Sequence, residues 1–148
     1  MLKLNLRKKD YWITLPGQVK VKVKPISTAL MSAAQMMALD AYRVQLESGE
    51  LNDVSDTLRK GLSESMLIKS LAQISIIEWE GVLQADSDDP APVNDHTVSQ
   101  LMDIWLIAQD FLKQYVVQFK LLVTEGNVSA PAATGTSAAE ALTASSAA

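Results

Sequence analysis

Few side chains in this 148-residue sequence have the types and spacing that catalysis requires. Glu78 and Glu80 are two residues apart, so on the helix predicted for this region they point away from each other and make a poor general acid/base pair. The chain has no cysteine, which excludes disulfides and thiolate nucleophiles. Its one histidine, His96, cannot build a multi-histidine metal site within one chain. His96 follows Asp95 at a predicted helix start, where we expect a surface or capping role.

Three aspartates between residues 86 and 89 offer oxygen ligands for a hard cation. A calcium-binding EF-hand loop that begins at Asp86 needs a glycine and a glutamate at the positions that Ala91 and Thr97 occupy. The sequence also lacks the motifs of phosphate-binding loops, dinucleotide sites, hydrolase nucleophiles and zinc proteases. We therefore expect no enzyme activity, no metal, no cofactor and no small-molecule substrate.

The charge is distributed unevenly along the chain. Residues 1–24 contain seven lysines and arginines and one aspartate, a net charge of +6, so the other residues must carry −10 to give the total of −4. Few aromatic residues accompany the basic ones, and we expect a solvated face rather than a nucleic-acid interface. No stretch approaches 18 uninterrupted apolar residues, so the sequence predicts no membrane span.

The N-terminal segment predicts a β-hairpin at about residues 11–24. Aromatic and β-branched residues at 11–15 precede Pro16-Gly17, which suits a type II turn. Residues 19–24 alternate valine and lysine, so the valines share one face and the lysines share the other. Because a lone hairpin is marginal in water, the valine face is expected to pack on the body. The lysine face is expected to stay open and to oppose pairing at the sheet edge.

Two helices are predicted next, at about 28–48 and 56–79. Ser27 or Thr28 is expected to cap the first, and Gly49 to end it. Gly61 is a possible weak point in the second, and residues 74–79 also have strand propensity. The first helix carries a stripe of small and apolar residues that we expect to face the core: Leu30, Ala34, Met37, Ala41 and Val44.

The third helix is predicted at about 97–125. A capping box of Thr97 and Gln100 begins it, with Asp95 as an alternative cap. At 1.5 Å per residue it is roughly 42 Å long, more than the diameter of about 35 Å expected for the body. The sequence thus predicts a mainly α domain at 1–126, a three-helix core with a small N-terminal β-hairpin. A flexible tail is expected at 127–148, where 16 of 22 residues are Ala, Ser or Thr.

Apolar residues surround the predicted third helix near its end instead of forming one stripe. In residues 115–123, seven of nine are apolar. Either the hairpin and the first two helices cover both sides, or a partner or a second copy does. The candidate partner contacts are the large apolar and aromatic residues of this helix: Trp105, Phe111, Tyr115, Phe119 and Leu122. Each has a competing role in the core, and the core is the better interpretation for Trp105 and Leu122.

The order of these segments resembles the tail assembly chaperones of long-tailed bacteriophages and related prophages. The resemblance covers roughly residues 11–136 and rests on the hairpin segment 11–17, an Ala- and Met-rich helix, the IIEWEGV segment at 76–82, an Asp/Pro loop before a long helix, and 125–127 before the Ala/Ser/Thr/Gly tail. The sequence departs from the family pattern in two places. Residues 88–90 lack the usual glycine, and Gly126 replaces a basic residue.

The resemblance implies a mostly helical protein that binds the tape-measure protein and keeps it soluble during tail assembly. It also implies that the protein forms a homo-oligomer, acts in the cytoplasm of the bacterial host and is absent from the mature virion. The alternative is a structural virion subunit, such as a tail-tube or head–tail joining protein, but such a subunit needs more β-sheet than one hairpin. A small DNA-binding regulator that uses the basic hairpin is a third hypothesis.

Overall fold

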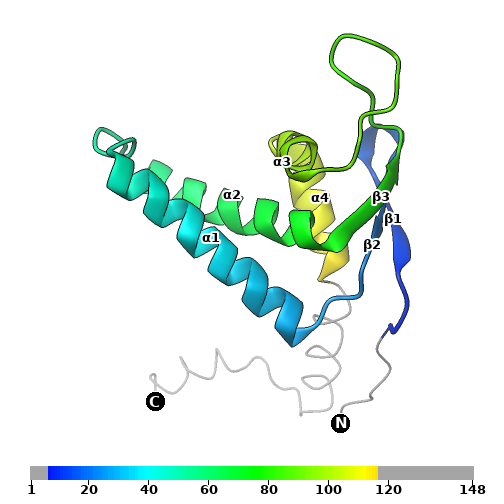
Figure 1. The fold of residues 1–148 in the computed structure, drawn as a ribbon, viewed down its shortest axis with the longest axis horizontal. Helices are drawn as coiled ribbons and strands as arrows, with labels where there is room; N and C mark the ends of the chain where they lie inside the picture. Colours follow the sequence, from blue (N-terminus) through cyan, green and yellow to red (C-terminus); the bar gives the residue numbers. More distant parts are fainter. Residues whose placement is uncertain (1–6, 117–148) are drawn as a thin grey trace, which may run out of the picture. The chain divides into compact units, whose positions relative to one another are not determined.

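The computed structural model describes residues 7–116, which form four α-helices and a three-stranded antiparallel sheet (Figure 1). The boundary predicted at residue 126 and the tail predicted after it lie outside the described residues. The elements follow in this order: β1 (Tyr11–Leu15), η1 (Pro16–Gln18), β2 (Val19–Val23), α1 (Thr28–Ser48), α2 (Asp56–Ser75), β3 (Ile76–Glu80), α3 (Asp95–Met102) and α4 (Trp105–Tyr115).

The predicted mainly α fold with a three-helix core is wrong. The described residues form a mixed α/β fold, 57% helical and 15% strand. One cause is β3, which was predicted as the end of the second helix but leaves α2 after Ser75 and pairs with β2. Its isoleucines and Trp79 are residue types that favour a half-buried β-strand, and this segment forms one by pairing with β2. The helix α2 continues through Gly61 without a break.

The predicted third helix is two helices. It breaks at Asp103 and Ile104, between α3 and α4. The Asp103 carboxylate forms an ion pair of 2.6 Å with Lys69 of α2, which ties the break to that helix. The start of α3 also differs from the predicted cap, because the capping box is formed by Asn94 and Thr97. The predicted length of roughly 42 Å is therefore wrong within the described residues.

The hairpin and α1 are confirmed within a residue or so. Ser27 caps α1, and Gly49 ends it with a positive φ of 83°. Leu15 pairs with Val19, so residues 16–18 connect β1 to β2, and Gln18 joins Gly17 in having a positive φ.

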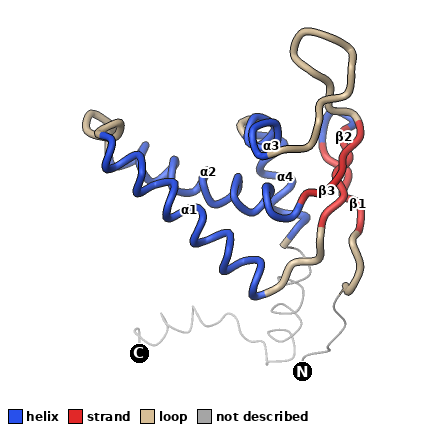
Figure 2. The backbone as a smooth tube through the Cα atoms, in the orientation of Figure 1, coloured by secondary structure: helices blue, strands red, loops and turns tan. Residues whose placement is uncertain are grey.

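The sheet is ordered β1-β2-β3, so β2 is its central strand (Figure 2). Val21 pairs with Ile13 of β1 and with Trp79 of β3. The three valines of β2 are buried, as predicted. The lysines of β2, however, cannot protect a sheet edge, because β1 and β3 are the edge strands. A register shift next to Lys22 leaves Ile77 as the extra residue of a bulge.

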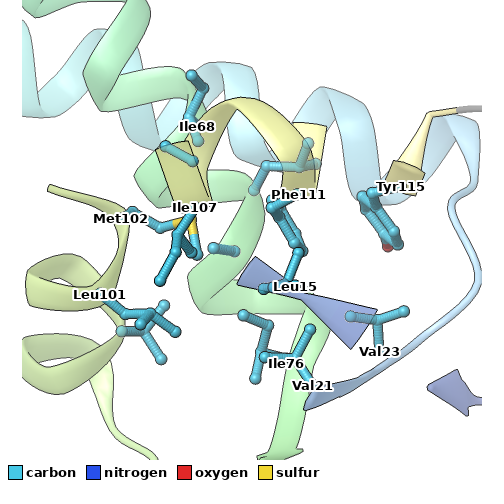
Figure 3. Packing of buried hydrophobic residues seen from close by; sticks show 14 of the residues in the cluster. Leu15, Val21, Val23, Ile68, Ile76, Leu101, Met102, Ile107, Phe111 and Tyr115 are labelled. Carbon is cyan, nitrogen blue, oxygen red and sulfur yellow. The ribbon is translucent and has the colours of Figure 1, made fainter. Parts of the chain in front are cut away.

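The hydrophobic core joins the inner face of the sheet to α2, α3 and α4 (Figure 3), and Ala34 of α1 also belongs to it. Phe111 and Tyr115 of α4 are fully buried, and their rings stack with centroids 5.3 Å apart. The Tyr115 hydroxyl donates a hydrogen bond of 2.6 Å to the carbonyl oxygen of Lys24, where the chain leaves β2. Residues far apart in the sequence are thus fixed to one another around α4.

Replacing Tyr115 with phenylalanine is expected to lower the free energy of unfolding by about 1 kcal/mol, because the hydrogen bond to Lys24 is lost. Ser75 is the control. Burial raises the pKa of Tyr115. Ser75 Oγ is buried without a hydrogen-bond partner in the described part of the chain. Ser75→Ala is therefore expected to be neutral or stabilising. Urea denaturation of both variants measures the difference; equal losses would contradict these assignments.

Candidate functional site

The structure separates the five residues predicted as partner contacts. Phe111 and Tyr115 have no exposed surface and belong to the core, so they offer no contact area to a partner in this conformation. Trp105, for which the core was the better interpretation, is 69% exposed. Phe119 and Leu122 lie outside the described residues.

The break before α4 explains why Trp105 is exposed while Phe111 and Tyr115 are buried. The sequence pattern treats Leu101, Trp105 and Ala108 as one stripe on a continuous helix. Because α3 ends at Met102 and α4 begins at Trp105, the stripe does not continue across the break. The buried residues of α4 are Ile107, Ala108, Phe111 and Tyr115. Trp105, at the first position of α4, is left on the surface.

Trp105 lies between two other exposed apolar residues. Ile104 and Leu106 are each more than half exposed. We call these three consecutive residues the 104–106 surface. Scattered exposed apolar side chains are normal, but adjacent large ones on a small domain are typical of an interaction site.

A groove of about 270 Å³ lies beside Trp105, between α2 and α4. Gly61 and Ser65 of α2 line one wall, and Trp105 and Ala108 of α4 line the other. The rest of the lining is mixed, with two apolar and three polar residues: Ile68, Met102, Glu64, Asp103 and Gln109. A Cβ atom added to Gly61 would meet no atom within 4 Å, so packing within the chain does not require glycine there. The 104–106 surface thus combines a projecting tryptophan with an adjacent open groove.

A second groove, of about 510 Å³, lies on the other side of this surface. Ile104 lines it together with Leu101 of α3 and with Leu83 and Pro92 of the loop between β3 and α3. Leu83 is exposed as well. Apolar side chains therefore continue from the start of α4 toward this loop.

The IIEWEGV segment, which carried the best part of the family resemblance, has a structural role. The indole N–H of Trp79 donates a hydrogen bond of 2.8 Å to the Ala91 carbonyl, and the Ala91 N–H donates one of 2.9 Å to Val82. Gly81 has a positive φ of 83° and lies against the backbone of Gln18. These contacts hold the loop between β3 and α3 to the end of the sheet, so they support one border of the 104–106 surface.

The two glutamates of this segment lie on a strand and not on the helix predicted for them. Residues two apart on a strand point to the same face, and the register places Glu78 opposite Lys22 and Glu80 opposite Lys20. Lys22 and Glu78 form an ion pair of 3.3 Å. Each glutamate therefore opposes a lysine on the open face of the sheet, and the lysine face is partly neutralised.

Within residues 7–116, no group of three or more histidine, aspartate or glutamate side chains is arranged to hold a metal ion. The aspartates at 86–89 lie in the predicted loop, and His96 is exposed in the first turn of α3. None of the helices in this range is long and apolar enough to cross a membrane. The feature that stands out chemically is the 104–106 surface.

Comparisons with protein-family models, with curated proteins and with solved structures found no match.

Proposed function

We propose that this protein is a tail assembly chaperone of a long-tailed phage or prophage, without enzyme activity or a cofactor. It binds the tape-measure protein and keeps it soluble during tail assembly, while it self-associates. The observation that supports this proposal is the 104–106 surface, because its three neighbouring apolar side chains are more than half exposed. The family resemblance supplies the identity of the bound protein.

The energetics favour a partner at this surface. Complete burial of one large apolar side chain contributes about 1.5–3 kcal/mol, so covering these three residues contributes several kcal/mol to binding. Tryptophan is also the residue type most enriched among the residues that dominate binding energy. Trp105 is therefore the expected anchor of the interface.

The shape of the surface suits a helix as the bound element. Amphipathic helices bind by laying apolar residues, spaced three and four apart, into an apolar groove. Tape-measure proteins are long and helix-rich, with apolar stripes prone to aggregation. A stripe of this kind can pack on Trp105 and place a side chain in the groove beside it, where Gly61 leaves room.

The proposal includes a location and excludes other partners. The protein acts in the cytoplasm of the bacterial host, is absent from the mature virion and has no nucleic-acid partner. The pairing of Lys20 and Lys22 with glutamates supports the last point, because it reduces the positive field of the sheet. Mass spectrometry of purified particles distinguishes a chaperone from a virion subunit, which would be abundant there.

Co-expression with the tape-measure protein tests the role of Trp105. Trp105→Ser is expected to weaken binding by roughly 30-fold, as for an anchor worth about 2 kcal/mol, and to reduce the soluble fraction of the tape-measure protein. The matched control is Trp12→Ser, because Trp12 is the other exposed tryptophan of the described residues and lies on the open face of the sheet.

The control is expected to keep the tape-measure protein as soluble as the wild-type chain does. The proposal fails if the tape-measure protein is equally insoluble with and without the wild-type chain. The assignment of the surface fails if both tryptophan variants behave alike.

A further inference from the structure

Helix α1 buries its small side chains and exposes its large ones. Ala34 and Ala38 are its only buried residues, whereas Met36, Leu39 and Val44 are all more than half exposed. Only part of the stripe predicted to face the core does so, because its last two residues, Ala41 and Val44, are exposed. α1 packs mainly against α2, and in the described residues no extensive contact joins it to the sheet or to α3 and α4 (Figure 2).

The exposed side of α1 carries a second stripe, made of three large apolar residues and one arginine. Met36, Leu39, Arg43 and Leu46 follow one another at spacings of three, four and three, the pattern of a helix–helix seam. We call this stripe, together with Asp40, the outer face of α1. Its side chains are exposed, and Asp40 and Arg43 form an ion pair of 3.2 Å within it.

The outer face carries the same two residue types on either side of its middle, although at unequal spacing. From the middle of the helix, an ion-pairing residue comes first on either side, Asp40 or Arg43. A leucine follows on each side, Leu39 directly after Asp40 and Leu46 three residues after Arg43. Two such helices in antiparallel orientation, related by a twofold axis near residues 41 and 42, place Asp40 of each copy beside Arg43 of the other. Leu39 of each copy then lies within about 3 Å, along the helix axis, of the level of Leu46 of the other. A twofold interface requires this self-complementarity, and an unrelated helix has no reason to match it.

We propose that the outer face of α1 binds the outer face of a second copy of this chain, as an antiparallel helix pair. The inference deepens the self-association included in the proposed function, but it rests on α1 and not on the 104–106 surface. A helix of 21 residues is about 31 Å long. One helix face of this length buries less than the roughly 800 Å² per partner of a standard interface, which is typical of weak complexes, so we expect a dimer Kd of about micromolar order or higher.

Sedimentation velocity of the full chain alone, at about 5–500 μM, tests the surface. Leu39→Glu is expected to raise the dimer Kd at least tenfold, because it places a carboxylate in the seam. Leu58→Glu is the matched control, since Leu58 of α2 is also 57% exposed but lies outside α1. Circular dichroism checks that both variants retain the helices.

Charge reversal tests the antiparallel arrangement and the identity of the partner. Asp40→Arg and Arg43→Asp each place like charges together in a homodimer, so each variant alone is expected to be monomeric at concentrations where the wild type dimerises. An equimolar mixture is expected to recover dimers, because each copy then meets the opposite charge. A client helix on this face gives no such recovery.

Three results would overturn the proposal: a wild-type chain that remains monomeric at the highest concentration, equal effects of Leu39→Glu and Leu58→Glu, or a mixture that does not recover dimers. Because no tape-measure protein is present, these failures leave the proposed function standing. Conversely, a tape-measure protein that stays insoluble with the wild-type chain would reject the proposed function without affecting the dimer measurement. If Leu39→Glu abolishes that solubility while the wild-type chain alone is monomeric, the outer face binds the client and the dimer proposal is wrong.

Discussion

Phe111→Ala is expected to lower the free energy of unfolding by about 3–5 kcal/mol, whereas Trp105→Ala is expected to change it by less than about 0.5 kcal/mol. The two aromatic residues lie six positions apart on α4. The sequence predicted both as candidate partner contacts, with the core as the better interpretation for Trp105. Phe111 is fully buried and stacks on Tyr115, so its removal leaves a cavity. Trp105 projects from the first turn of α4 and contributes little to the fold.

Urea denaturation followed by circular dichroism measures both variants, with the slope of the transition as a check that the unfolded surface is unchanged. Figure 3 shows the Phe111 side chain among buried residues of several elements, including Leu15 of β1, so no single neighbour can fill its space. If Trp105→Ala is as destabilising as Phe111→Ala, the break between α3 and α4 is misplaced and Trp105 belongs to the core.

Gly81→Ala is expected to lower the free energy of unfolding by about 3 kcal/mol or more. Its positive φ of 83° costs any other residue roughly 1–2 kcal/mol. A Cβ at this position would also lie 2.4 Å from the carbonyl oxygen of Gln18, a backbone atom that cannot rotate away. The end of β3 must therefore move from the β1–β2 turn, at a further cost in pairing.

Two other glycines provide the controls for Gly81. Gly17 has a similar φ of 79° but open space at its Cβ position, so Gly17→Ala should cost only about 1–2 kcal/mol. Gly61 lies inside α2 with open space and no positive φ, so Gly61→Ala should stabilise the chain by about 1 kcal/mol. Thermal unfolding of the three variants gives their order. A loss at Gly81 no larger than that at Gly17 would contradict the backbone contact with Gln18.

The hairpin and α1 could be predicted because short sequence patterns within each element determine them. The hairpin follows from alternation and a Pro-Gly turn, and α1 follows from Ser27 and Gly49 at its ends. The strand β3 depends instead on pairing with β2, more than 50 residues earlier, and a helical period cannot report that pairing. The strand propensity of residues 74–79 was the available signal, and tertiary pairing decided in its favour.

The candidate site could be predicted only in part for a related reason. Trp105 was among the candidates because large aromatic residues dominate interfaces. Its exposure, however, depends on the turn at Asp103, which a contact with Lys69 of α2 supports. Neither proline nor glycine marks that turn in the sequence, so the apolar pattern of two helices was interpreted as that of one. Phe111 and Tyr115 were then candidate partner contacts with a competing core role, and both lie in the core.

Site-specific photo-crosslinking tests the central claim most directly. A benzoylphenylalanine placed at position 105, in cells that also express the tape-measure protein, is expected to crosslink to that protein. The same group at position 12, on the open face of the sheet, is expected to give no such product. Equal crosslinking from both positions, or none from position 105 while the tape-measure protein remains soluble, would contradict binding at the 104–106 surface.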